Sequence, residues 1–442
     1  MTSRPLLRLS FAASCAIAAA AAPATPAVTY SVVAYLPGGA YVGPAGIMQG
    51  GPGTFYTQGD GPALFSVSLK GQFTTLATFT SPPFVISSNP VPASNRLVYS
   101  SVQTAEGGSQ ASVFSVGATA GTEHTYPAQT VVPSLAANLP DGSFFGVAYG
   151  FSGKPPALAT VDTAGEVTPF YQFPTGSTVY LPIYGADGNY YGTGYTYGVP
   201  GTYLYKATPS GSFTQLAVMP FGTTAFAGVG LVLQGSDGNF YGIQSTGAGC
   251  SASNQHGAVY KLTPSGQFTI LHDFGVCGNG VVNTLIQASD GKLYGATQGN
   301  SLFSLTTSGE YKALFKTTNG STEGLCPCWL LQGSDGKLYG MAQGGGPHGD
   351  GVFFALDAGL PIPRPQALEF SPASGAAGTK VRIWGRNLLQ ASAQFNGAAA
   401  AGVYNSGPNY VWATVPEGAT TGPIMVTTPG GTSTTAASFT VQ

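Results

Sequence analysis

The residues best suited to chemistry are two histidines in equivalent loops of an internal repeat, within the segments NQHGAV and GPHGDG. Together with Glu323 or Asp350, the pair His256 and His348 could bind a metal ion or supply a general base. The alternative interpretation is that His-Gly is one variant of the residues that end these loops. We favour this second interpretation, and we expect no metal, no cofactor and no catalytic residue. The two histidines are then candidates only for contacts with a ligand on the loop surface.

Five aspartates recur in one local setting, in which Asp-Gly precedes a short aromatic segment that ends in glycine. They do not form the D-x-[DN]-x-[DN]-G pattern of a calcium-binding loop. Asp-Gly between alternating apolar residues predicts a two-residue hairpin with a type I′ turn, whose two central residues both have positive φ. We therefore interpret these aspartates as structural turn residues. They are Asp141, Asp187, Asp237, Asp290 and Asp335.

Four cysteines remain once the predicted signal peptide, which contains Cys15, has been removed. They are Cys250, Cys277, Cys326 and Cys328. An even number of cysteines in an exported chain predicts disulfides. The favoured pairing joins the first two and leaves the Cys-Pro-Cys pair either bridged across its proline or present as a dithiol. No CxxC motif or histidine pair at ligand spacing accompanies Cys-Pro-Cys, which argues against a zinc site.

The first 27 residues are typical of a signal peptide. Arg4 and Arg8 supply a positive region, residues 11–22 form a short apolar run, and residues 22–27 offer small residues for cleavage. That run is too short to span a bilayer, and no other long apolar stretch exists, so we expect no membrane span. We expect a secreted, periplasmic or cell-surface protein. Only 7% of residues are charged and the formal net charge is −2, so no electrostatic surface for nucleic acid is expected.

The elements that position these residues come from a repeat whose copies are 43 to 53 residues apart. Each copy predicts four short strands, and four strands at this period are typical of a β-propeller blade. Seven copies predict an all-β protein with a seven-bladed β-propeller over residues 28–360. We expect the repeated tyrosines of the last four copies to pack between blades. The repeated aromatic positions are Tyr56, Tyr99, Phe145, Tyr191, Tyr241, Tyr294 and Tyr339.

The two ends of the repeat predict how the ring closes. After Gly359 the expected fourth strand is replaced by the proline-rich segment 360–365, which lacks several backbone donors. The mature chain opens with YSVVAYLP at residues 30–37, which aligns with the fourth strands of other copies. We expect this N-terminal strand to complete the last blade, so that the seam has no unpaired edge.

The segment LVLQGSDGNFYG, with GAVYKLTPSGQFTILHDF after it, resembles the tandem repeat of the GloVer, or choice-of-anchor, family of secreted bacterial proteins. The resemblance covers residues 28–359 and is strong in the last four copies. In the first two copies Pro52 and Asn95 replace the turn aspartate. The resemblance implies an exported repeat protein and no established activity.

A second unit follows a proline-rich linker at residues 361–366. Residues 367–442 contain alternating strands with glycine and proline turns, which predicts a small β-sandwich. The segments FSPASGAAGTKVRIWG, FNG and VPEGATTGPIMVTTPGG resemble the IPT/TIG domain. This resemblance implies an immunoglobulin-like fold, which serves secreted proteins as a spacer or an interaction module.

The loops opposite the Asp-Gly turns vary in length and contain all four mature cysteines. Loops on a rigid scaffold are common binding sites, and Trp329, beside Cys-Pro-Cys, is the aromatic candidate there. We expect a monomeric, non-enzymatic scaffold that binds carbohydrate or protein through these loops. Two alternatives remain open: a metal-assisted lyase similar to the seven-bladed streptogramin lyases, and a purely structural spacer.

Overall fold

The computed structural model describes the chain in a series of ranges separated by gaps. The predicted signal peptide lies outside them, apart from its last residue. The described ranges are residues 27–36, 46–58, 63–78, 84–86, 91–92, 97–104, 111–117, 123–125, 131–150, 154–162, 164–199, 201–219, 227–246, 256–276, 281–318, 320–405 and 407–442.

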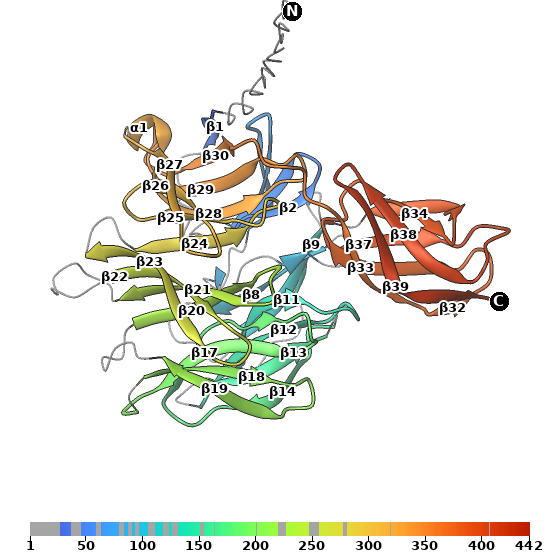
Figure 1. Ribbon diagram of the computed structural model, residues 1–442, viewed down its shortest axis with the longest axis horizontal. Helices are drawn as coiled ribbons and strands as arrows, with labels where there is room; N and C mark the ends of the chain where they lie inside the picture. Colours follow the sequence, from blue (N-terminus) through green and yellow to red (C-terminus); the bar gives the residue numbers. More distant parts are fainter. Residues whose placement is uncertain are drawn as a thin grey trace, which may run out of the picture.

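Almost all of the described elements are β-strands, which form small antiparallel sheets in sequence order along residues 29–357 (Figure 1). The first sheet of the repeat consists of β2 (Met48–Gly51), β3 (Thr54–Gln58), β4 (Ala63–Ser68) and β5 (Phe73–Thr78). The second consists of β6 (Phe84–Ile86), β7 (Val91–Pro92), β8 (Leu97–Thr104), β9 (Ala111–Gly117) and β10 (Glu123–Thr125). The third consists of β11 (Val131–Asn138), β12 (Phe144–Gly150), β13 (Ala157–Val161) and β14 (Val167–Gln172).

The same arrangement continues through the rest of the repeat. Its sheets are β15 (Ser177–Val179), β16 (Ile183–Tyr184), β17 (Tyr190–Thr196), β18 (Thr202–Ala207) and β19 (Phe213–Met219); β20 (Ala227–Gln234), β21 (Phe240–Thr246), β22 (His256–Leu262) and β23 (Phe268–Val276); β24 (Val282–Gln287), β25 (Leu293–Thr297), β26 (Ser301–Leu305) and β27 (Tyr311–Lys316); and β28 (Leu325–Gln332), β29 (Leu338–Gly344) and β30 (Val352–Asp357). A single short helix, α1 (Gly320–Glu323), precedes β28 in the described ranges, and it is far too short to cross a membrane.

The sheet of β28, β29 and β30 is completed by the first strand of the chain, β1 (Thr29–Tyr35). This strand runs antiparallel to β30, and Thr29 lies opposite Asp357. The ring of Tyr30 stacks on Phe315 of the neighbouring sheet, with ring centroids 4.2 Å apart. Strand β30 therefore has a partner on both sides, although one partner comes from the other end of the repeat.

Neighbouring sheets pack through buried aromatic rings. The ring centroid of Tyr191 lies 4.4 Å from that of Phe240, and that of Tyr339 lies 4.6 Å from that of Phe55 in the β2–β5 sheet. The last sheet of the repeat therefore contacts the first, and the contacts continue from sheet to sheet in a propeller-like ring. The expected packing of the repeated tyrosines is confirmed, because all four are at most 4% exposed: Tyr191, Tyr241, Tyr294 and Tyr339.

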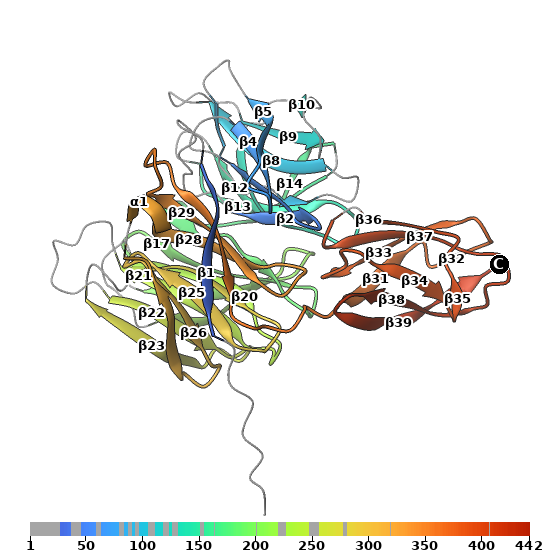
Figure 2. The same cartoon turned by 90° about the horizontal axis from the view of Figure 1, so that it is seen from above.

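The C-terminal strands form two further sheets that project from one side of the ring in both views (Figures 1 and 2). They share one core, in which Val381, Ile383, Val411 and Ile424 are fully buried. The first sheet is β31 (Gln366–Ser371), β33 (Lys380–Arg386), β37 (Tyr410–Thr414) and β36 (Gly402–Asn405), and the second is β32 (Ser374–Gly375), β39 (Gly431–Val441), β38 (Gly422–Thr428), β34 (Ser392–Phe395) and β35 (Ala398–Ala399).

Candidate functional site

The Asp-Gly turns have a different geometry from the one that the sequence predicts. In the turn before β17, the N–H of Gly188 donates to Gly185 O over 3.0 Å, and the N–H of Gly185 donates to Asn189 O over 2.8 Å. Gly188 has a φ of 76°, whereas Asp187 has no positive φ. This is a three-residue loop with a left-handed glycine after a type I turn. The type I′ prediction is therefore wrong, and the same holds for the other four turn aspartates, because none of them has a positive φ.

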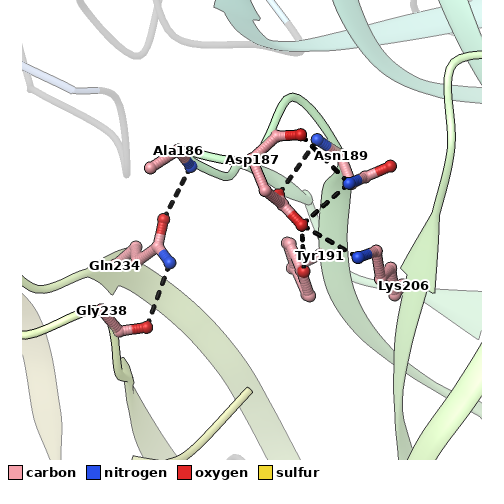
Figure 3. Close-up of polar contacts among 7 residues, drawn as sticks. All are labelled: Ala186, Asp187, Asn189, Tyr191, Lys206, Gln234 and Gly238. Carbon is pink, nitrogen blue, oxygen red and sulfur yellow. Dashed lines mark hydrogen bonds and ion pairs between the residues drawn. The ribbon is translucent and has the colours of Figure 1, made fainter. Parts of the chain in front are cut away.

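The aspartate side chain in these turns is used as a hydrogen-bond acceptor. Asp187 Oδ1 accepts the N–H of Asn189 over 3.2 Å, while its Oδ2 accepts the hydroxyl of Tyr191 over 2.8 Å and the ammonium of Lys206 over 2.9 Å (Figure 3). Burial raises the pKa of Asp187, but the hydrogen bonds from Lys206, Tyr191 and Asn189 outweigh burial and lower this pKa to about 2. The same aspartate-to-tyrosine bond joins Asp237 to Tyr241, Asp290 to Tyr294 and Asp335 to Tyr339.

Asp141 is the exception among the five. Phenylalanine occupies the position of the tyrosine, at Phe145, and the Asp141 carboxylate instead accepts the N–H and hydroxyl of Ser143 over 2.9 and 2.6 Å. In all five turns the aspartate carboxylate accepts hydrogen bonds from donors of its own hairpin, and Asp187 also accepts one from Lys206 on β18. These contacts give the repeated aspartate a role in shaping the hairpin and fixing the tyrosine ring.

A glutamine at the end of the first strand of a sheet binds the turn of the neighbouring sheet, and such bridges reach four of the five aspartate turns. Gln234 Oε1 accepts the N–H of Ala186 over 2.8 Å, and its Nε2 donates to Gly238 O over 3.1 Å (Figure 3). Glutamine precedes the turn in three near-identical segments, but its contact with the neighbouring sheet is not evident from the sequence. Equivalent bridges join Gln287 to Ser236, Gln332 to Ser289 and Gln49 to Ser334.

We call the side of the ring that carries these turns the turn face. The C-terminal sheets bind to it: Arg382 Nη2 donates to Pro140 O over 2.6 Å, and the buried hydroxyl of Tyr410 donates to Leu139 O over 2.8 Å. The linker is held as well, because Gln332 Nε2 donates to Pro361 O over 3.1 Å. A cavity of about 220 Å³ remains between the two units. The chain therefore covers part of its own turn face.

We call the opposite side, where β1 and β17 end and β28 begins, the loop face. Large apolar side chains are exposed there: Tyr197 is 79% exposed, Val199 61%, Leu325 42% and Tyr35 41%. Tyr197 stands on a turn that is fixed by its own N–H, which donates to Gly176 O over 3.0 Å. These residues lie on strands or hydrogen-bonded turns, and the C-terminal sheets do not cover their side chains. A ligand could therefore contact them.

The Gloeobacter/Verrucomicrobia repeat matches residues 181–408 of this sequence, which is more than half of the chain. The chain belongs to this family. The match begins at the copy that contains Asp187 and ends among the C-terminal strands, beyond the end of the repeat expected at Gly359. The turn aspartates, the bridging glutamines and the packed tyrosines of the last four copies all lie within the part that matches the family repeat.

Solved structures similar to this member of the repeat family include propellers. The WD40 propeller domain of Doa1 is 10% identical, with a TM-score of 0.49 over 75% of this chain and 97% of that one. YCF48 bound to D1 peptide is 10% identical, with a TM-score of 0.48 over 75% and 96%. A fungal alcohol oxidase in complex with copper is 12% identical, with a TM-score of 0.48 over 93% and 100%. No curated protein sequence matches this chain.

The two candidate histidines of this family member belong to different sheets of the ring. His256 begins β22, where its backbone is opposite Val276, and its side chain is outside the described part. His348 is exposed between β29 and β30. The Glu323 carboxylate accepts the N–H of Thr318 over 2.6 Å. Within the described ranges no three His, Cys, Asp or Glu side chains are grouped closely enough to hold a metal ion.

Only two of the four candidate cysteines lie in the part of the chain that the structure describes. Cys250 and Cys277 lie outside the described residues. Cys326 and Cys328 are free thiols whose sulfur atoms are 3.8 Å apart. Trp329 follows them in β28, and its ring is only partly exposed, with the indole Nε1 buried and without a partner among the described atoms. Among the described residues, the exposed aromatic side chains of the loop face are therefore Tyr35 and Tyr197.

Proposed function

We propose that this protein is an exported, monomeric, non-enzymatic scaffold that binds a protein segment or a carbohydrate through its loop face. Its organisation would be a signal peptide at residues 1–27, a seven-bladed propeller at 28–360, a linker at 361–366 and an immunoglobulin-like IPT/TIG module at 367–442. Each sheet of the ring is one blade in this proposal, and a disulfide joins Cys250 to Cys277.

The exposed apolar side chains of the loop face are the observation that carries the binding proposal. A tyrosine with 79% of its surface exposed on an ordered turn, as at Tyr197, presents an apolar ring and a hydroxyl with little rotational freedom to lose. Tyrosine is enriched at binding surfaces for this reason. Aromatic and apolar side chains also offer stacking surfaces to sugar rings, so both ligand classes fit the same residues.

The turn face also supports the assignment of binding to the loop face. Its turns are joined by glutamine bridges and partly covered by the C-terminal sheets through Arg382 and Tyr410. Such a face holds the scaffold together, and a rigid scaffold with variable loops on its other side is a common design of binding proteins.

Binding assays with matched variants on the two faces test this proposal. The purified protein is screened against an array of bacterial surface glycans and a library of peptides, and the affinity for the best ligand is measured. Leu325→Ala on the loop face and Leu69→Ala on the turn face form a matched pair, because the two leucines are 42% and 43% exposed.

We expect Tyr197→Ala to weaken binding about tenfold, which corresponds to about 1.4 kcal/mol, because tyrosine is enriched among the few interface residues whose truncation is costly, and we expect Leu325→Ala to weaken it by a smaller factor. Leu69→Ala should leave the affinity unchanged. A ligand whose affinity falls with Leu69→Ala and not with the loop-face variants would contradict the proposal, as would the absence of any ligand in both screens.

A further inference from the structure

The Cys-Pro-Cys segment at the start of β28 has an unusual local geometry. In a regular strand, residues i and i+2 point to the same side and lie about 6.6 Å apart along the strand. Here the two sulfur atoms are only 3.8 Å apart. Two features cause the approach: Cys326 has a φ of 55°, and the pairing of β28 with β29 shifts register between Pro327 and Trp329. Bulges of this kind re-aim side chains, often next to functional sites.

The neighbouring sheet holds this geometry in place. The N–H of Cys326 donates to Asn300 Oδ1 over 2.7 Å, from the connection between β25 and β26. Asn283 Nδ2, from β24, donates to Pro327 O over 2.9 Å and to Cys326 Sγ over 3.5 Å. The backbone of the dithiol is therefore fixed by two asparagine side chains, and one of them also contacts a sulfur atom.

The two thiols are not equivalent. Cys326 is partly exposed at the loop face, whereas Cys328 is 6% exposed. The hydrogen bond from Cys328 lowers the pKa of the Cys326 thiol, burial opposes it, and Asn283 lowers the pKa further, to a value of about 7. The hydrogen bond with Cys326 and burial raise the pKa of Cys328. An accessible thiol of low pKa beside a buried thiol of high pKa is the arrangement of an attacking and a resolving cysteine.

We propose that Cys326 and Cys328 form a redox-active dithiol that exchanges with small-molecule disulfides at the loop face. The Cys326 thiolate attacks one sulfur of the disulfide RSSR, forms a mixed disulfide and releases RS⁻, which takes up the proton that Cys326 has lost. Cys328 then attacks Cys326 Sγ, breaks the mixed disulfide and passes its proton to the second departing thiolate. The dithiol is oxidised by two electrons, and RSSR is reduced to two RSH.

The geometry also permits the bridge to close. A disulfide bond is about 2.05 Å long, so the sulfur atoms must approach each other by about 1.8 Å from their separation of 3.8 Å. Asn300 and Asn283 hold the N–H of Cys326 and the carbonyl of Pro327, so we expect rotation of the two cysteine side chains to make this approach.

Oxidised glutathione is the probe for the test. The folded protein is reacted with it, quenched at intervals by alkylation and mapped by mass spectrometry of peptides without reduction. We expect the unchanged protein to form a bridge within the peptide that contains Cys326 and Cys328. Cys328→Ser should instead accumulate a glutathione adduct on Cys326, because the resolving sulfur is gone. Cys326→Ser should react at least about tenfold more slowly at Cys328, which is buried and protonated.

A second measurement separates this role from a merely structural one. The alkylation rate of Cys326 is followed against pH in the Cys328→Ser and Cys328→Ala variants, and thermal melts show that both are folded. Serine keeps a hydrogen-bond donor to Cys326 Sγ and alanine does not, so the pH at half-maximal rate should be higher in Cys328→Ala. The proposal is overturned if Cys326 is linked to Cys250 or Cys277 in the native protein. Equal reactivity of Cys326 and Cys328 in the two single serine variants would also overturn it.

Discussion

The hydroxyl of Tyr241 donates a hydrogen bond to Asp237 Oδ2 over 2.7 Å, while Asp237 Oδ1 accepts the N–H of Asn239 over 3.1 Å. Oδ2 also accepts the side-chain amide of Asn239 over 2.9 Å, so the carboxylate serves both the ring and the turn. The bond to Oδ2 from Tyr241 fixes a ring that is packed between sheets, and the bond to Oδ1 from the backbone of Asn239 shapes the turn. An asparagine at this position could perform only one of these tasks as an acceptor.

Replacing Asp237 by asparagine should therefore destabilise the protein, by up to about 1 kcal/mol, because the hydrogen bond from Tyr241 is lost. Tyr241→Phe should cost a similar amount for the same reason. The double variant should lose less stability than the sum of the losses in the two single variants, since both changes remove the same hydrogen bond. Denaturant unfolding of the four proteins measures this, and strictly additive effects would show that the two side chains act independently.

Acid should weaken the turn at Asp187 in a defined range of pH. The pKa of Asp187 is lowered to about 2 in the folded protein, whereas an aspartate in an unfolded chain has a pKa of about 3.9. The carboxylate therefore contributes its full stability above about pH 4, and this contribution is lost as the pH falls from about 4 towards 2. Asp187→Asn and Lys206→Met should both reduce the slope of stability against pH in that range. Urea unfolding at several pH values measures the slope, and an unchanged slope in both variants would refute the assignment.

The glutamine bridges should matter for the whole ring. Gln287→Ala removes the acceptor for Ser236 N–H and the donor to Gly291 O, two bonds of 2.7 and 2.8 Å. We expect a loss of about 2 kcal/mol in the free energy of unfolding. Gln287→Glu keeps the acceptor and should lose about half as much. Gln215→Ala, an exposed glutamine on β19, is the control and should change the value by less than about 0.5 kcal/mol.

The pairing of β1 with β30 makes the N-terminal strand essential to the ring. Deleting residues 28–37 removes this strand and leaves β30 with an unpaired edge, so we expect aggregation or a fall in Tm on the order of 10 °C. Tyr30→Phe is the mild control, because it keeps the stacking on Phe315 and loses only the hydrogen bond to Glu323 O. A truncated protein that melts like the full chain would rule out closure by this strand.

The contact between the C-terminal sheets and the turn face is held by few polar bonds, so it should be separable from folding. Arg382→Ala combined with Tyr410→Phe removes the bonds to Pro140 O and Leu139 O, which contribute about 1 kcal/mol each. We expect faster proteolysis in the linker at 361–366 and a larger radius of gyration in scattering. Lys380→Ala, an exposed change on the same strand, should alter neither. If the double variant also behaves like the unchanged protein, other contacts hold the two units together.

The sequence predicts the strands and the positions of the turns well, because both depend on residues close together in the chain. The period of the repeat locates the hairpins, and the residues of β1 can be aligned with fourth strands elsewhere. The predicted type I′ turn is wrong because Asp-Gly shows where a chain reverses direction but does not show how many residues the loop contains. Only Gly188 and its equivalents take the left-handed conformation, which leaves Asp187 free to accept hydrogen bonds.

The contacts between sheets could not be predicted in the same way. Gln234 binds the backbone of Ala186, 48 residues earlier, and Asn283 binds Pro327 O, 44 residues later. Periodicity shows that such residues recur, but it does not show which neighbour they reach. The exposure of Tyr197 and the hydrogen bond between Cys326 and Asn300 likewise depend on contacts in the folded chain, which the sequence does not show.

The join between β1 and β30 has a consequence for the order of events during synthesis. Residues Thr29–Tyr35 are among the first to leave the ribosome, and their partners Val352–Asp357 follow more than three hundred residues later. Until then the early strand has no place to pair, and the nascent chain carries an open edge at each end. A contact between such distant parts of the sequence forms slowly, and unpaired edges promote association with other chains. We therefore expect the incomplete chain to associate with other chains unless it is protected until its last strands arrive.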